Sequence, residues 1–278
     1  MSEAGEVGDG SRALAPWGER PTPVSDLTSF ALVIEYDGTD FAGFQFQPGR
    51  RTIQAELERA LGRATGAAPR LSAAGRTDAG VHAAGQVVSF ATAWRWGPER
   101  LVAALNHYLP PDVAVRRAVT VPQQFDARRA ACSRTYLYKI WNAHPRSPLR
   151  RRDMAHIDRP LDGYAMAAAA AHLVGLRDLR AFAAGPLAGR PTVREVFRAE
   201  VCRQGDLVCL ELEASSFLQH QVRLTAGTLI RVGLGALSVA DFKALIAAGD
   251  RRQAGPNAPA AGLCLQYVRY APELGLYQ

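Results

Sequence analysis

The stretch AGRTDAGVH, residues 74–82, places two glycines, an arginine, an aspartate and a histidine between two segments of strand-forming residues. Loops of this composition carry function when a rigid scaffold holds them. The glycines permit positive φ or a close approach of the backbone to a ligand, and Asp78 between them can act as a nucleophile or base. The same residues also fit an Asx turn, in which Asp78 only caps its own loop.

The segments around this loop predict a mixed α/β first half. Alternation of apolar and polar residues indicates strands. Apolar residues spaced i, i+4, i+7 and i+8 after Thr52, a plausible N-cap, indicate a helix. Strands are therefore expected at residues 30–36, 70–73, 86–91, 112–119 and 134–142, and helices at residues 53–64 and 98–105.

The second half has similar element content. Helices are expected at residues 161–174, 217–232 and 239–247, and strands at residues 194–202, 207–214 and 263–270. Because strands and helices do not alternate with βαβ regularity, the sequence favours an α+β fold. We expect a mixed, largely antiparallel sheet with helices packed on it rather than a doubly wound parallel sheet.

Composition suggests where the fold begins and divides. Residues 1–28 are rich in Gly, Ser, Pro and acidic side chains, which predicts a disordered tail. A Pro- and Arg-rich stretch at residues 145–152 predicts the boundary between an N-terminal half, 29–145, which carries the loop, and a C-terminal half, 146–278.

Charge and cysteine usage limit the partners and the compartment. The chain of 278 residues has 33 basic and 26 acidic side chains, a net charge of +7, which favours a polyanionic partner such as nucleic acid. Only two of the basic residues are lysines, so a GC-rich genome is an alternative source of the arginines. Four cysteines without metal-site spacing indicate a reducing compartment, and the longest apolar run, 165–174, is too short to span a bilayer. We therefore expect a cytoplasmic protein without a structural metal.

An arginine is suited to hold a carboxylate ionised inside a pocket, because burial alone disfavours the charged form. His220, Arg223 and Gly227 share one stripe of a predicted helix at spacing i, i+3, i+7. The glycine would let that helix approach its neighbour closely, and the guanidinium of Arg223 can fork onto a carboxylate. Taken alone, Arg223 fits a solvated or structural ion-pair partner better than a catalytic one.

One predicted strand interleaves aromatic and basic residues. Tyr136, Tyr138 and Ile140 share one face, and Leu137 and Lys139 share the other. An aromatic face of this kind can stack a nucleobase taken out of its helix. Ordinary core packing accounts for the same pattern.

Four common catalytic motifs are missing from the sequence. It holds no G-x-x-x-x-G-K-[ST], no G-x-G-x-x-G between a strand and a helix, no G-x-S-x-G and no H-E-x-x-H. Nucleotide hydrolysis, Rossmann redox chemistry, serine hydrolysis and zinc proteolysis therefore lose support.

The loop at residues 74–82 resembles the signature of the tRNA pseudouridine synthase A family. The resemblance extends from about residue 30 to residue 270, through segments 35–38, 41–47, 52–61, 106–110, 125–128, 134–142, 192–194, 216–227 and 259–265. It implies a pseudouridine synthase fold of two α/β halves that share a mixed sheet. It also implies Asp78 as nucleophile, Arg223 as its ion-pair partner and Tyr136 as the base-stacking residue, with Arg76, Arg128 and Leu265 as further substrate-binding residues.

The resemblance implies that a uridine at position 38, 39 or 40 of the tRNA anticodon stem-loop is flipped out and isomerised. It implies a homodimer that clamps tRNA and no metal or organic cofactor. The sequence leaves open whether Asp78 attacks C1′ of the ribose or C6 of the base. Two alternatives remain: a pseudouridine synthase with another RNA target, and an RNA-binding or tRNA-folding protein without catalysis.

Overall fold

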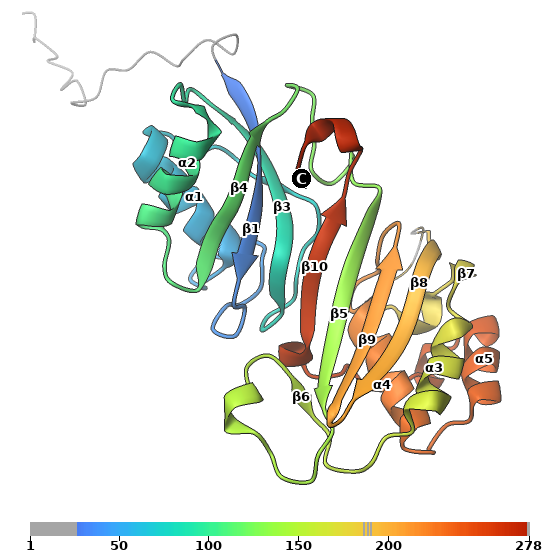
Figure 1. Cartoon of the computed structure of the whole chain (residues 1–278). Coiled ribbons are helices and arrows are strands. Elements are labelled where there is room, and N and C mark those ends of the chain that lie inside the picture. Colours follow the sequence, from blue (N-terminus) through green and yellow to red (C-terminus); the bar gives the residue numbers. More distant parts are fainter. Residues whose placement is uncertain (1–26, 186, 188, 190, 277–278) are drawn as a thin grey trace, which may run out of the picture.

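One mixed sheet of ten strands runs through the computed structural model, which describes residues 27–276 apart from 186, 188 and 190 (Figure 1). Eight strands follow the order β4-β1-β3-β10-β5-β9-β8-β7, and the short strands β2 and β6 pair with β3 and β5. The strands are β1 (Thr28–Tyr36), β2 (Ser72–Ala73), β3 (His82–Thr92), β4 (Val113–Thr120), β5 (Ser133–Trp141), β6 (Ala155–His156), β7 (Gly175–Asp178), β8 (Val193–Gln204), β9 (Leu207–Ala214) and β10 (Leu263–Arg269).

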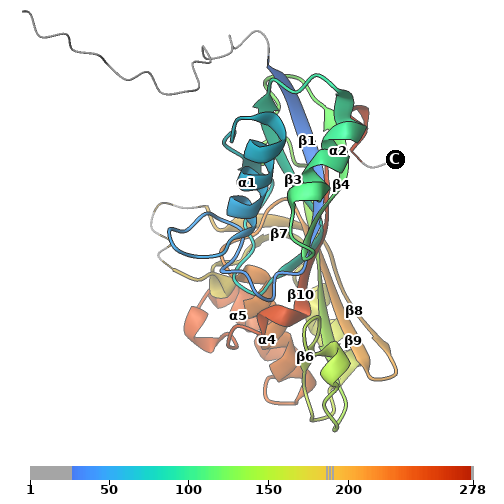
Figure 2. The same ribbon diagram turned by 90° about the vertical axis from the view of Figure 1, so that its left-hand side faces the viewer.

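Only the β10–β3 and β5–β6 pairs are parallel, so the expected mixed, largely antiparallel sheet is confirmed. Five α-helices are described: α1 (Ile53–Thr65), α2 (Gly97–Tyr108), α3 (Gly163–Ala171), α4 (Gln221–Gly233) and α5 (Val239–Ala248). Figure 2 shows α1, α4 and α5 on the same side of the sheet. The α+β class is therefore confirmed. No helix in the described part of the chain combines the length and the apolar content that a membrane span needs.

Helix α1 forms where the apolar spacing predicts it. Thr52 caps it by accepting a hydrogen bond from the N–H of Ala55 (3.3 Å), and Gly66 ends it in the left-handed conformation (φ 79°). The stripe Ile53, Leu57, Ala60 and Leu61 is buried. Burial of one such leucine contributes about 2 kcal/mol to stability.

Several expected boundaries shift in the structure. The helix expected at 217–232 begins only at Gln221, because His220 has a left-handed backbone (φ 59°) that a helix cannot include. The helix expected at 161–174 covers 163–171, and the strand expected at 86–91 already begins at residue 82. Strand β7 was not expected. Of the predicted tail, residues 1–26 lie outside the described residues, and Thr28 belongs to β1.

The C-terminal strand β10 is inserted between two strands that come from residues 29–145. It lies between β3 and β5, parallel to the first and antiparallel to the second. In register, Leu265 of β10 faces Ala83 on one side and Tyr136 on the other. This register brings the end of the 74–82 loop close to the aromatic strand.

Candidate active site

Asp78 lies in the loop between β2 and β3, and hydrogen bonds fix the backbone on both sides of it. The N–H of Phe44 donates to the carbonyl of Thr77 (3.0 Å), and the N–H of Val81 donates to the carbonyl of Asp78 (3.2 Å). The hydroxyls of Tyr36 and Thr77 are also hydrogen-bonded (2.9 Å). The carboxylate of Asp78 is therefore presented from a rigid turn.

Two glycines allow the loop between β1 and α1 to pack against this turn. A Cβ on Gly38 would lie 2.0 Å from the carbonyl oxygen of Val81, and one on Gly43 would lie 2.9 Å from that of Thr77. Gly43 also has a positive φ of 101°. Only residues without a side chain fit at these two positions, so the two loops form one unit.

Helix α4 and the residue just before it each supply one nitrogen group to the Asp78 carboxylate. Nη1 of Arg223 donates to Oδ2 (3.1 Å), and Nε2 of His220 lies 3.5 Å from the same oxygen. The side chains of Asp78 and Arg223 are 29% and 17% exposed, so the pair is screened only in part. The other oxygen, Oδ1, has no hydrogen bond or ion pair with any residue in the described ranges. The charge-assisted hydrogen bond orients the carboxylate and leaves one oxygen available.

Tyr136 lies beside the carboxylate. Its ring is buried and packs edge-to-face on Phe217, with the ring centroids 5.1 Å apart. Its hydroxyl would be 3.8 Å from a Cβ on Gly75, three residues before Asp78. Burial, and secondly the charge of Asp78, raise the pKa of Tyr136 above its ordinary value. Its hydroxyl is therefore protonated at neutral pH, and it makes no hydrogen bond to the described part of the protein.

Arg134 is buried and holds the start of the 74–82 loop. Its guanidinium forms no ion pair with a carboxylate of the described residues. Nη2 donates to the carbonyls of Ala74 (3.0 Å) and Arg128 (2.8 Å). Nη1 donates to those of Ser215 (2.7 Å) and Ala131 (3.3 Å). Burial lowers the pKa of Arg134 below its ordinary value. One guanidinium thus joins the loop, the segment before β5 and the end of β9.

The remaining predicted site residues differ in position. Arg76 is exposed and has no ion pair with any described residue. Arg128 is also exposed, and its carbonyl is held by Arg134. Leu265 is buried and is the β10 register partner of Tyr136. Within the described ranges, no group of three His, Cys, Asp or Glu residues could hold a metal ion.

Sequence reasoning missed the contact of His220 and the role of Arg134. A signal existed for His220, because it lies three residues before Arg223 on the same predicted stripe. Arg134 gave none, since an arginine that enters a strand resembles any surface arginine.

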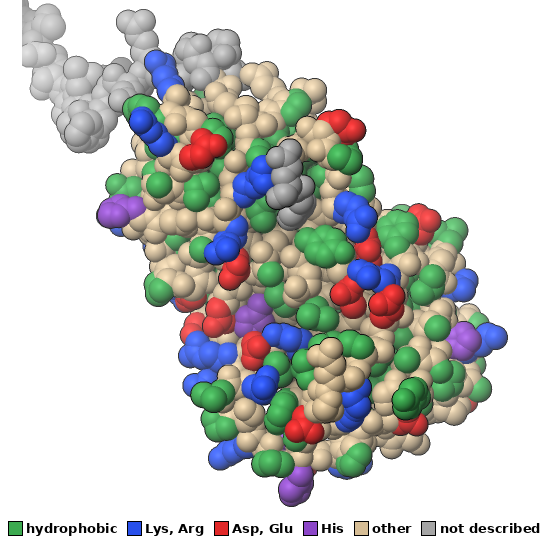
Figure 3. Space-filling model, viewed as in Figure 1, with side chains coloured by type: hydrophobic (Ala, Val, Ile, Leu, Met, Phe, Trp, Pro, Cys, Tyr) green, Lys and Arg blue, Asp and Glu red, His purple; other side chains and the backbone are tan. Residues whose placement is uncertain are grey.

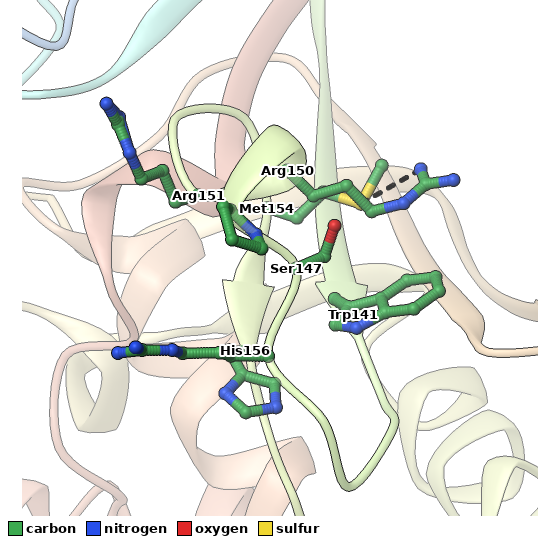
Figure 4. Close-up of a pocket in the computed structure, with 8 residues that line it drawn as sticks. Trp141, Ser147, Arg150, Arg151, Met154 and His156 are labelled. Carbon is green, nitrogen blue, oxygen red and sulfur yellow. Dashed lines mark hydrogen bonds between the residues drawn. The ribbon is translucent and has the colours of Figure 1, made fainter.

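A hollow of about 400 Å³ lies at the end of β5, beside Trp141 (Figure 4). The guanidinium of Arg150 lies 4.6 Å from the centroid of the Trp141 ring. Arg146 and Arg151 also line the hollow, are exposed and have no ion pair with any described residue. Figure 3 shows several basic side chains on the part of the surface where Figure 1 places β6. Arg152, next along the chain, pairs with Asp40 (3.3 Å).

Comparison with known proteins decides the family. The sequence profile described as tRNA pseudouridine synthase matches residues 32–128 and 169–271. The chain belongs to this tRNA pseudouridine synthase family. The first matched range holds Asp78 and the second holds Arg223, while Tyr136 lies between the two ranges. The family resemblance and the enzyme class expected from the loop are confirmed.

Relatives named tRNA pseudouridine synthase A are similar along nearly their whole length. The one from Geotalea daltonii is 41% identical over 244 residues, which are 88% of this chain and 100% of that protein. The one from Moorella thermoacetica is 44% identical over 241 residues, 86% of this chain and 98% of that protein. The one from Methylobacterium sp. is 44% identical over 250 residues, 90% of this chain and 100% of that protein.

Proposed function

We propose that this tRNA pseudouridine synthase isomerises uridine at positions 38, 39 and 40 of the tRNA anticodon stem-loop, with Asp78 as the nucleophile. One observation carries the proposal: Arg223 holds Oδ2 of Asp78 at 3.1 Å, and Oδ1 has no partner among the described residues. Family membership and the names of the relatives support the tRNA substrate.

The reaction requires the target nucleotide to leave its stack, because Asp78 cannot reach C1′ or C6 of a base paired inside a stem. Tyr136 supplies a buried aromatic ring against which the extruded uracil stacks. Arg76, two residues before Asp78, is exposed and has no ion pair within the described ranges, so it is available to contact a phosphate or to fill the space of the displaced nucleotide.

Oδ1 of Asp78 attacks C1′ of the ribose or C6 of the uracil, and the bond between N1 and C1′ breaks. The base turns, and C5 forms the new bond to C1′. In the C1′ route, formation of this bond displaces the carboxylate of Asp78, whereas in the C6 route the bond between Asp78 and C6 breaks afterwards. C5 then loses its proton and N1 gains one. The composition of the nucleotide is unchanged, so the reaction consumes no cofactor.

Incubation of the protein with unmodified tRNA, followed by carbodiimide-dependent reverse-transcription stops, tests this proposal. We expect stops at positions 38 to 40. Stops only at other uridines would indicate a different RNA target. Tight tRNA binding without any stop would favour the RNA-binding or tRNA-folding alternative.

Replacement of Tyr136 by Phe should keep tRNA affinity within about 2-fold and lower kcat by about 10-fold, the value of one polar contact to the reacting base. The ring and its stacking remain, whereas the hydroxyl, which has no other partner in the described part of the chain, is lost. Single-turnover rates and filter-binding affinities separate the two effects. An unchanged rate would show that the ring alone carries the role of Tyr136.

We further propose that the enzyme is a homodimer whose two subunits contact one tRNA. We also propose that the hollow beside Trp141, which Arg146 and Arg151 line, contributes phosphate contacts. The net charge of +7 supports a phosphate-binding surface. Arg146 and Arg151 support it locally, because their charges are not neutralised by any described carboxylate.

The affinity for tRNA should therefore fall steeply with salt. In a plot of log Kd against log salt concentration, replacing both Arg146 and Arg151 by Ala should reduce the slope by about 1.5, since each phosphate contact contributes about 0.7 to 0.9. Arg116→Ala is the matched control, because that exposed arginine is already paired with Glu35 (3.6 Å). A salt-independent affinity, or equal slopes for the double variant and wild type, would contradict this surface.

A further inference from the structure

We propose that His220, oriented by Asn257, is a positioning residue that holds Oδ2 of Asp78 together with Arg223 and thereby directs Oδ1 at the substrate. The inference rests on the proposed function. Nε2 of His220 lies 3.5 Å from Oδ2, the oxygen that Nη1 of Arg223 reaches at 3.1 Å. Two groups on one oxygen fix the rotation of the carboxylate more tightly than one group does.

Asn257 determines which ring nitrogen carries the proton. The side-chain amide nitrogen of Asn257 lies 3.2 Å from Nδ1 of His220 and donates to it. In the neutral ring the proton then resides on Nε2, the nitrogen that faces Asp78. A separation of 3.5 Å is long for a hydrogen bond, and catalytic contacts are often this long in the free enzyme and shorten once substrate is bound.

The backbone of His220 is held in an unfavourable conformation. Among the described residues it is the only non-glycine residue with a positive φ (59°). Such conformations persist where the surroundings impose them, and they cluster at functional sites. The His220 side chain makes no hydrogen bond to the first N–H groups of α4, so helix capping does not account for it. Its polar contacts go to Asp78 and Asn257 instead.

The loop that carries Asn257 is fixed on α4. The N–H of Ala258 donates to the carbonyl of Arg223 (3.0 Å), and Nε of Arg223 donates to the carbonyl of Ala258 (2.9 Å). A Cβ on Gly227 would lie 1.9 Å from the carbonyl oxygen of Pro256, so only glycine permits this approach. Arg223 and Asn257 are therefore placed by the same contact between loop and helix.

Two substitutions of His220 separate positioning from folding. His220→Asn removes the group at the Nε2 position, while asparagine is well suited to a left-handed backbone. We expect this variant to keep the wild-type Tm and KM and to lose about 10-fold in kcat. His220→Gln places an amide near the position of Nε2, so its kcat should stay within about 3-fold of wild type. Glutamine is no better suited than histidine to the left-handed backbone at this position.

Asn257→Ala completes the test. If Asn257 acts through His220, the double variant with His220→Asn should be no slower than His220→Asn alone. His107→Ala, at an exposed histidine on α2, is the control and should retain full activity. Unchanged kcat in His220→Asn, or losses in both His220 variants that follow their Tm, would overturn the proposal. Wild-type enzyme and Asp78→Asn are assayed in parallel, so a wild type without product would instead contradict the proposed function.

Discussion

Asp78→Asn is expected to abolish pseudouridine formation and to leave the fold intact. Asparagine has nearly the volume of aspartate, and its amide oxygen can still accept the hydrogen bond from Nη1 of Arg223. The neutral amide cannot form the covalent bond to C1′ or C6 that the reaction requires. We expect single-turnover rates to fall by at least about 10³-fold, which corresponds to about 4 kcal/mol of transition-state stabilisation.

The affinity of Asp78→Asn for tRNA should not fall along with its catalytic rate. The substitution removes one negative charge that faces a polyanion, so the affinity for tRNA should equal or exceed that of wild type. Asp158→Asn is a matched control, because Asp158 is exposed and has no ion pair with any described residue. Product formed by Asp78→Asn at a rate near wild type would contradict the nucleophile, and loss of tRNA binding would indicate damage to the fold.

Local pattern predicted the elements of this fold better than their arrangement. The spacing of apolar residues from Ile53 to Leu61 predicts a helix, because one stripe of it must be buried. The residue types at 74–82 indicate a functional loop without reference to the rest of the fold. The insertion of β10 between β3 and β5 is a pairing of segments far apart in sequence. No local periodicity encodes such a pairing, so the register of Leu265 with Tyr136 had to come from the structure.

The same limit applies to the site. Asp78 and Arg223 could be proposed as partners because a carboxylate in a loop needs a cation. The left-handed backbone of His220, which delays the start of the predicted helix, follows from contacts with Asn257 and Asp78 rather than from its own propensity. The role of Arg134 could not be predicted from the sequence either, since its four carbonyl partners come from segments that only the folded chain brings together.

Arg134→Leu should be the most destabilising of the substitutions considered. It removes a buried guanidinium and leaves the carbonyls of Ala74, Arg128 and Ser215 without their charged donor. Hydrogen bonds to charged groups contribute about 1.5 to 3 kcal/mol each, and carbonyls left buried add a desolvation cost. We expect the free energy of unfolding to fall by about 3 kcal/mol or more, and Tm by about 5 to 10 °C, as measured by calorimetry.

Arg269→Leu is the matched control, because it lies on the neighbouring strand β10 with a half-exposed side chain paired to Glu213 (3.5 Å). Removing such a pair should change stability by about 0.5 kcal/mol or less. Equal Tm values for Arg134→Leu and Arg269→Leu would contradict the structural role of Arg134.

Arg134→Lys keeps the positive charge but removes the planar set of hydrogen-bond donors, so it distinguishes the effects of the two. An ammonium group has three donors on a flexible stem and cannot span carbonyls on three segments as the planar guanidinium does. Because one of these carbonyls belongs to Ala74, four residues before Asp78, the loop should lose order while the sheet remains folded. We therefore expect kcat to fall, and amide hydrogen exchange in residues 74–80 to rise, at a temperature where the variant is fully native. Wild-type exchange in this loop would show that Arg134 stabilises the sheet without positioning the nucleophile.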